Sequence, residues 1–293
     1  MPEPSPESLS TALPRSLAPK RDRLFETLRG YQRCVVALSA GVDSAVVAKA
    51  AFLTLGEQAS AVTAASASLA AGELETAVAL ARQIGIRHEV IATNEFADPD
   101  YVRNNPDRCY HCKTELYSRL GPLAMSVDAV IVNGANLDDQ GDYRPGMQAA
   151  AERAVRSPLI ECELTKAEVR LLAAHWGLPV WDKPATPCLS SRVAYGEEVT
   201  AERVAMIDRA EQYLRGLGLQ SLRVRYHRGD LARLEVPLEA VPRLCEPSVR
   251  EELVRQLREI GFRFVTLDLE GFRSGSLNTL LPVEQLLKYP RSR

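Results

Sequence analysis

The chain has 293 residues, of which 46% are hydrophobic and 25% charged, and its formal net charge is −2. This composition is that of a globular protein, and the length suffices for one large domain or two smaller ones. The charge argues against a broad nucleic-acid-binding surface, which needs a basic excess. No apolar run approaches the ~20 residues that a membrane span requires. We therefore expect neither nucleic-acid nor membrane partners.

The first twenty residues are rich in proline and serine and lack the apolar core of a secretory signal. We interpret residues 1–20 as a disordered leader and place the protein in the cytoplasm. Six cysteines in a chain without such a signal are more often thiols or metal ligands than disulfides.

A strand, a glycine-containing turn and a helix follow one another from residue 34. The apolar run 34–38 predicts a buried strand, and a helical pattern opens after Ser39-Ala40-Gly41-Val42-Asp43-Ser44. Free N–H groups and the helix dipole favour phosphate at such a helix N-terminus. The two serine hydroxyls add donors, and Asp43 could hold a magnesium ion that bridges phosphate oxygens.

This turn resembles the pyrophosphate loop of the ATP pyrophosphatase superfamily, usually S-G-G-x-D-S, whose members cleave ATP to AMP and pyrophosphate. Ala40 replaces the first glycine of that pattern, so a strongly positive φ there would strain the backbone. The alternative is an ordinary strand-to-helix turn capped by Asp43 or Ser44. The residues that the resemblance assigns to ATP and pyrophosphate are Ser39, Gly41, Val42, Asp43, Ser44 and Gly134.

Helical and strand patterns alternate after the turn, which is typical of a parallel sheet covered by helices. Thr165 and Glu168 predict a capping box at the start of one of these helices. The resemblance implies a Rossmann-like α/β fold of the adenine nucleotide alpha-hydrolase type for residues 21–198. The predicted strands are 59–64, 88–92 and 128–133, and the predicted helices are 72–84 and 166–176.

The pattern changes after about residue 198. Two strands, a helix and a strand follow a long helix, so residues 199–293 are expected to form a smaller α+β domain. We expect this domain to serve substrate binding or oligomerisation. Its predicted elements are a helix from Thr200 to Arg215, strands 221–226 and 232–236, a helix 248–260 and a strand 263–269.

Three cysteines lie in segments that suggest chemistry. Cys109 and Cys112 form a C-x-x-C motif, which alone fits half a zinc site, a redox pair or part of an iron–sulfur site. Cys188 lies in a turn-prone segment, where a nearby guanidinium would favour its thiolate. The alternative for Cys188 is a half-buried structural cysteine. We interpret Cys34, Cys162 and Cys245 as structural and His111 as a turn residue.

Several strings in the same order along the chain resemble the LarE family, ATP-dependent sulfur transferases that build the nickel-pincer nucleotide cofactor. The resemblance covers nearly the whole chain beyond the leader, which makes it far more specific than the loop alone. The strings are 39–44, 108–113, 134–139, 142–146, 156–159, 187–192, 223–225 and 268–276.

The resemblance implies the reaction. The family's substrate is similar to nicotinic acid mononucleotide but carries two ring carboxylates. ATP adenylates one carboxylate, a protein-held sulfur displaces AMP to give a thiocarboxylate, and the other carboxylate follows. Cys188 matches the sulfur-supplying position, and in members with this cysteine alone its own sulfur is surrendered. Cys109, Cys112 and Cys188 together imply a [4Fe–4S] cluster with one open iron and multiple turnovers.

Further site residues lie on predicted strands and turns. Arg223 and Arg225 alternate on a strand, so their guanidinium forks face one side and suit the substrate's phosphate. The alternative is a solvated basic strand. Arg192 and Glu211 are expected to line the same site. Asp138 is a second magnesium candidate, with helix capping as an equal alternative.

Three other functions share some of these features. A tRNA-thiolating enzyme shares the loop and often a three-cysteine cluster, but the slight acidity and the lack of an RNA-binding appendage argue against it. Amide formation, as in NAD or GMP synthesis, has no use for three cysteines. A non-catalytic zinc module would have an open site rather than a closed structural one. The LarE resemblance also implies a homo-oligomer, a trimer or a hexamer.

Overall fold

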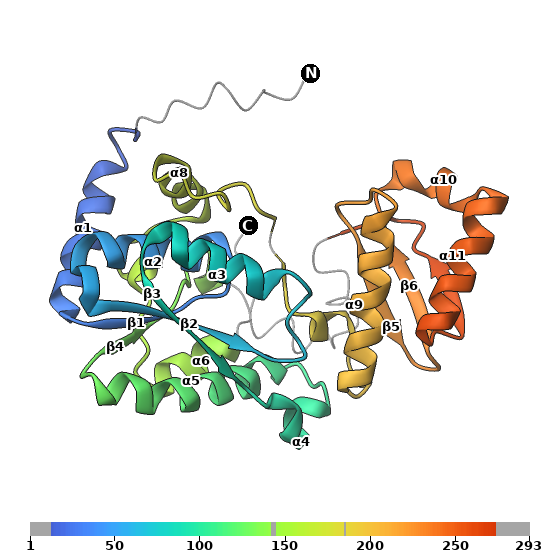
Figure 1. Ribbon diagram of the computed structural model, residues 1–293, viewed down its shortest axis with the longest axis horizontal. Coiled ribbons are helices and arrows are strands. Elements are labelled where there is room, and N and C mark those ends of the chain that lie inside the picture. Colours follow the sequence, from blue (N-terminus) through green and yellow to red (C-terminus); the bar gives the residue numbers. More distant parts are fainter. Residues whose placement is uncertain (1–12, 142–144, 185, 274–293) are drawn as a thin grey trace.

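The computed structural model describes residues 13–141, 145–184 and 186–273. They form a four-stranded parallel sheet with strand order β3-β2-β1-β4 and a separate three-stranded sheet (Figure 1). The parallel sheet confirms the predicted Rossmann-like fold. No helix within these ranges has the length and apolarity to cross a membrane. The parallel strands are β1 (Cys34–Ala37), β2 (Ala59–Ala65), β3 (Arg87–Ala92) and β4 (Val130–Val132).

Helices cover both faces of the parallel sheet, as Figure 1 shows. On one face α2 packs against the sheet and is itself covered by α1 and α8, which explains why it is apolar nearly all round. The predicted capping box of Thr165 and Glu168 begins α8. This face carries α1 (Ala18–Tyr31), α2 (Val42–Leu55), α3 (Glu73–Ile84) and α8 (Lys166–His175), and the other carries α5 (Arg108–Ser126) and α6 (Pro145–Glu152); α4 (Pro99–Val102) and α7 (Pro158–Glu161) are short connections.

The order of the parallel strands reverses at β1. The chain runs from β1 to β2 and β3 on one side, whereas β4 pairs with β1 on the other. In open sheets of this kind ligands bind outside the carboxyl ends of the strands at the reversal. The turns that follow β1 and β4 therefore meet where a ligand is expected.

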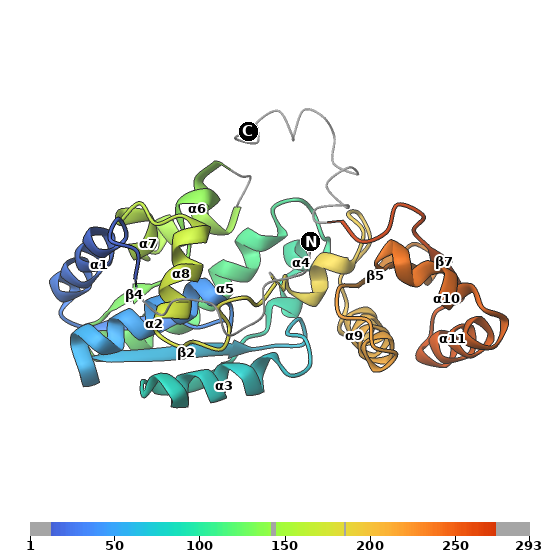
Figure 2. The same cartoon turned by 90° about the horizontal axis from the view of Figure 1, so that it is seen from above.

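The second sheet belongs to a smaller unit beside the first (Figure 2). β5 (Arg223–His227) runs antiparallel to β6 (Leu231–Glu235), and β6 runs parallel to β7 (Phe264–Leu267). This arrangement confirms the predicted α+β character. Tyr101 of α4 and Leu189 belong to the same buried cluster, so the segment around Cys188 joins the two units. The helices here are α9 (Ala201–Gly216), α10 (Val241–Cys245) and α11 (Pro247–Ile260).

The start of the chain differs from the expected leader. Residues 18–20 form the first turn of α1, and Leu17 before it is buried. Pro19 is tolerated in a first helical turn, and Lys20 pairs with Glu168 of α8 at 2.8 Å. Disorder is therefore the wrong prediction for residues 17–20. Residues 1–12 and 274–293, with parts of the strings 142–146 and 268–276, lie outside the described residues.

The sequence patterns gave no helix at residues 108–126, where the structure has α5. Pro122 lies inside this helix, and the C-x-x-C motif occupies its first turn, so local signals obscure the helical period. His111 consequently lies on a helix rather than in a turn, with Nδ1 3.2 Å from Asp98 Oδ2. Cys245, interpreted as structural, is exposed, whereas Cys34 and Cys162 are buried.

Candidate functional site

The turn after β1 is a compact loop at the N-terminus of α2. Ser44 Oγ accepts the Ser39 N–H at 3.1 Å and donates to the Gly41 carbonyl at 3.1 Å. The hydroxyl oxygens of Ser39 and Ser44 lie 3.2 Å apart. No side chain in the described ranges caps α2, so the start of this helix is suited to an anion.

Ala40 has φ +57°, in the left-handed region, and is fully buried. The loop therefore requires the backbone conformation that glycine supplies in the S-G-G-x-D-S pattern. An L-residue adopts it at a strain of about 1–2 kcal/mol. Ala40 therefore carries the backbone strain that the sequence predicts, in the conformation that glycine adopts without strain.

We expect Ala40→Gly to leave the free energy of unfolding unchanged or to raise it by up to ~1 kcal/mol, because released strain offsets the extra chain entropy of glycine. The matched control is Ala48→Gly, at a fully buried alanine within α2. That change should lower the free energy of unfolding by at least ~1 kcal/mol. Urea unfolding measures both, and equal losses at the two positions would contradict strain at Ala40.

Gly134 follows β4 and packs directly on the loop. A Cβ atom at residue 134 would lie 2.6 Å from the backbone nitrogen of Ser44 and 2.9 Å from the carbonyl carbon of Asp43. Both atoms belong to backbone, which cannot move aside as a flexible side chain can. The close approach of β4 to the N-terminus of α2 therefore requires glycine.

Gly134→Ala should lower the free energy of unfolding by about 1–3 kcal/mol and weaken ATP binding, because the added methyl group pushes Ser44 out of place. Gly216→Ala is the control, since nothing lies within 4 Å of a Cβ at residue 216 in α9. The control should be neutral or stabilising by ~0.5–1 kcal/mol. Denaturant unfolding and ATP titration test the pair; equal behaviour of the two variants would refute the close packing.

Acidic and amide side chains surround the start of the loop helix. The Asp43 carboxylate contacts the ammonium of Lys166, and its Oδ1 accepts from Asn136 Nδ2 at 3.2 Å. Asp138 Oδ2 accepts the backbone N–H of Lys166, the first residue of α8, at 2.7 Å. Asp138 therefore caps α8, which agrees with the capping alternative. Lys183 Nζ lies 3.3 Å from the carbonyl oxygen of Ala40 on the loop.

Three buried arginine side chains hold the turn that carries Cys188. Cys188 is exposed and precedes the 3-10 turn Leu189–Arg192. Each arginine donates to backbone carbonyls of this turn, which fixes the peptide while the thiol stays accessible. The acceptors are Pro187 O and Cys188 O (2.9 Å) for Arg192, Ser190 O (2.8 Å) for Arg108 and Ser191 O (3.1 Å) for Arg225.

Cys112, near the start of α5, interacts electrostatically with both Cys109 and Cys188. Burial raises the pKa of the Cys112 thiol to about 12, Lys113 opposes this, and Cys188, Glu95 and Cys109 add to it. Burial disfavours the Arg108 cation, but its interactions with Cys188, Cys109, Tyr101 and Tyr195 together outweigh burial and raise the Arg108 pKa. Three thiols from two segments beside two cations are a donor set that fits a thiolate-bound metal cluster.

Two of these arginines, Arg192 and Arg225, also form buried ion pairs with carboxylates of the smaller unit, where Arg223 lies near them. Arg192 and Glu211 form an ion pair at 3.0 Å with both side chains fully buried. Arg225 is 6% exposed and pairs with the fully buried Glu235 at 2.9 Å, which argues against a solvated basic strand. Burial lowers the Arg223 pKa to about 10, helped by other arginines and opposed by Glu211. This concentration of positive charge suits an anion.

Comparison with known proteins agrees with this geometry. The family model for NAD synthase matches residues 24–103, which include the loop after β1. An uncharacterised protein of Synechocystis is 48% identical over 90% of this chain and 99% of its own length. The pyridinium-3,5-bisthiocarboxylic acid mononucleotide synthase of Lactiplantibacillus plantarum is 40% identical over 94% of this chain and 99% of that protein. The chain belongs to the LarE family.

The structure adds residues to this LarE-family site that the sequence analysis missed. The Tyr195 side chain interacts electrostatically with Arg108, Arg225, Cys109 and Cys188, so it lies near the thiols and the arginines. Arg108 itself is buried and holds the Cys188 turn. Arg108 belongs to the string 108–113, but that string does not indicate its contact with the Cys188 turn, and Tyr195 lies outside the strings.

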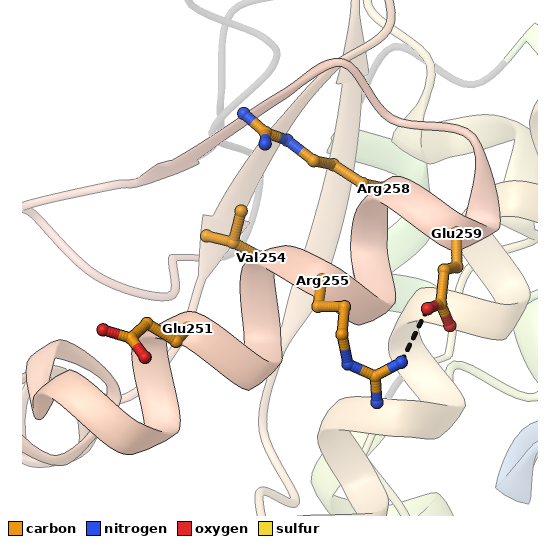
Figure 3. A pocket seen from close by; sticks show the side chains of 5 residues that line it. All are labelled: Glu251, Val254, Arg255, Arg258 and Glu259. Atoms are coloured by element: carbon orange, nitrogen blue, oxygen red, sulfur yellow. Dashed lines mark hydrogen bonds and ion pairs between the residues drawn. The ribbon is translucent and has the colours of Figure 1, made fainter.

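One further surface feature lies apart from the site, and a second includes His111 of the C-x-x-C segment. Figure 3 shows a depression lined only by residues of α11, where Arg255 donates to Glu259 at 2.6 Å. Asp98, Asp100 and His111 group their ligand atoms within 4.8 Å of one another, but Asp98 caps α4 and Asp100 pairs with Arg103 at 2.5 Å. Both features are accounted for by local hydrogen bonds and ion pairs.

Proposed function

We propose that the protein is an ATP-dependent sulfur transferase that converts the ring carboxylates of pyridinium-3,5-biscarboxylic acid mononucleotide into thiocarboxylates. The observation that carries the proposal is the Cys188 turn, whose backbone carbonyls are held by buried arginines while its thiol stays exposed. The printed name of the Lactiplantibacillus relative supports the same product class.

In this proposal the loop after β1 binds ATP. A substrate carboxylate oxygen attacks the α-phosphorus, the bond from that phosphorus to the bridging oxygen breaks, and pyrophosphate leaves. Magnesium on Asp43, with Asp138 as a second candidate, would offset the charge that develops on the pyrophosphate. The ATP-binding residues are Ser39, Gly41, Val42, Asp43, Ser44 and Gly134.

The second step replaces AMP by sulfur. A sulfide held at the three-cysteine site would attack the acyl carbon, the bond from that carbon to the AMP oxygen breaks, AMP leaves, and the sulfur stays on the substrate as the thiocarboxylate. Arg223 and Arg225 would bind the phosphate of the substrate nucleotide, with Arg192 and Glu211 shaping the pocket behind them. Repetition at the other carboxylate completes the product.

The presence of three cysteines at the site decides which sulfur source we propose. Cys109, Cys112 and Cys188 would hold a [4Fe–4S] cluster, which supplies sulfide from outside the polypeptide when bound. Arg108 and Lys113 would stabilise the thiolate ligands, because both cations interact with the cysteines. Cys188 then keeps its own sulfur, and one chain completes many turnovers.

The test is turnover with substrate, Mg²⁺·ATP and sulfide, on protein reconstituted without oxygen. We expect pyrophosphate release, more than one thiocarboxylate per chain and an unchanged Cys188 mass. At most one sulfur per chain, with Cys188 converted to dehydroalanine, would contradict the cluster and favour the sacrificial route. No substrate-dependent pyrophosphate release would contradict the whole proposal, and sulfur transfer to tRNA would favour a tRNA-thiolating enzyme.

We further propose a homo-oligomer, a trimer or hexamer, acting in the cytoplasm, with residues 199–293 serving substrate binding and assembly. Phe264 and Leu269 on the smaller unit are 61% and 82% exposed, which suits a contact between copies. Light scattering on the purified protein tests the assembly, and a monomer would contradict it.

A further inference from the structure

We propose that Lys166 is a phosphate-binding residue that exchanges the Asp43 carboxylate for the polyphosphate when Mg²⁺·ATP enters the loop. Before ATP arrives, the same ammonium competes with free metal ions for Asp43. This inference rests on the proposed function, because it takes Asp43 as a metal ligand.

Contacts of its backbone and of neighbouring residues fix the position of Lys166, and its own side chain takes no part in them. It is the first residue of α8, and Asp138 Oδ2 accepts its backbone N–H at 2.7 Å. The capping box of Thr165 and Glu168 defines the start of the helix, and Lys20 holds Glu168 at 2.8 Å. A side-chain substitution at residue 166 therefore leaves the helix start intact.

Both oxygens of Asp43 are engaged. Oδ2 contacts the Lys166 ammonium, and Oδ1 accepts from Asn136 at 3.2 Å. A metal ion on Oδ2 would stand at contact distance from that ammonium, and the repulsion between the two cations would displace the lysine. The side chain is 33% exposed, so it is free to swing on its four-carbon stem.

The displaced ammonium needs another anion close by. A polyphosphate at the N-terminus of α2 would lie next to Asp43, the second residue of that helix. Lys183 also reaches the loop, but Glu73 holds its ammonium at 2.8 Å. Lys166 is thus the cation that metal binding at Asp43 releases, and a phosphate oxygen is the partner that replaces the carboxylate.

The exchange predicts effects of opposite sign in one variant. Lys166→Met removes the competitor at Asp43, so Mn²⁺ alone should bind about fivefold more tightly. The same change removes a charged donor to phosphate, so Mg²⁺·ATP should bind about tenfold more weakly. A lysine that only supports the fold would not tighten one ligand while weakening the other.

The experiment measures Mn²⁺ binding by electron paramagnetic resonance without ATP, and Mg²⁺·ATP binding by calorimetry, on the full chain. Lys20→Met is the matched control: its ammonium pairs with a carboxylate at the same helix start, with the same 33% exposure, but contacts Glu163 and Glu168 instead of the loop. It should leave both affinities unchanged. Lys166→Arg keeps the charge and should stay close to wild type in both.

Unchanged Mn²⁺ affinity in Lys166→Met, or unchanged ATP affinity, would overturn the exchange. Asp43→Asn separates this result from the proposed function. If Asp43→Asn loses Mn²⁺ binding while Lys166→Met behaves like wild type, only the role of Lys166 is wrong. If Asp43→Asn keeps Mn²⁺ binding and substrate-dependent pyrophosphate release, both the role of Lys166 and the metal-binding role of Asp43 are wrong.

Discussion

Cys188→Ser should abolish thiocarboxylate formation while pyrophosphate release from ATP continues. The two steps use different groups: adenylation needs the loop after β1, and only the second step needs sulfur at residue 188. The turn should survive the change, because its contacts with the arginines go through backbone carbonyls. We expect product formation to fall more than about a thousandfold, because residue 188 no longer holds the sulfur source on which the second step depends.

Cys245→Ser is the control for Cys188→Ser. Cys245 is also exposed, but it ends α10 and takes no part in the interactions among the three site cysteines. It should leave both steps unchanged. Mass spectrometry of the product and a pyrophosphate assay give the two readouts. Thiocarboxylate formation at the wild-type rate in Cys188→Ser would refute the role of this residue.

Arg192→Met should lower the free energy of unfolding by about 3–5 kcal/mol, the usual cost of removing one partner of a buried ion pair. Glu211 would remain fully buried, still paired with Arg215, whose side chain is 35% exposed, and still interacting with Arg223. The carbonyls of Pro187 and Cys188 would also lose the donor that Arg192 supplies, although Ser191 still donates to the Cys188 carbonyl. Sulfur transfer should fall with stability, because the Cys188 turn loses one of the three arginines that hold it.

Two comparisons isolate the buried pair. Arg255→Met removes an arginine from exposed ion pairs with Glu252 and Glu259, and should cost less than ~1 kcal/mol. Adding Glu211→Leu to Arg192→Met should recover part of the loss, because no buried charge is left behind. Urea unfolding gives the free energy of unfolding of Arg192→Met, Arg255→Met and the double variant. A loss below ~1 kcal/mol in Arg192→Met would contradict the burial of this pair.

The sequence predicted those parts of the fold whose signals are local. Short apolar runs give β1, β2 and β4, and the capping box of Thr165 and Glu168 marks α8, because both patterns lie within a few residues. Helix α5 was missed, since Pro122 and the C-x-x-C motif hide its period. The segment 17–20 was mistaken for disorder because its order comes from packing on α8, about 150 residues away.

The candidate site was likewise predictable only where its residues form local motifs. The loop, Gly134 and the three cysteines stand out as strings of residue types. The contacts that give these residues their roles leave no such pattern in the sequence. Lys166 contacts Asp43, which is 123 residues away along the chain, and Arg108 donates to the Ser190 carbonyl, 82 residues away. Such contacts depend on the topology of the sheet and on how the smaller unit joins it. Arg192 illustrates this, because its charge suggested phosphate binding while its donors hold the Cys188 turn.

Iron and acid-labile sulfide, measured per chain after anaerobic reconstitution, test most directly the claim that a cluster supplies the sulfur. We predict about four irons and at least four sulfides in the wild type and in Cys245→Ala. Cys109→Ala, Cys112→Ala and Cys188→Ala should each lose most of both. A wild-type protein without iron, or a Cys109→Ala/Cys112→Ala protein that keeps its iron and its turnover, would contradict the account.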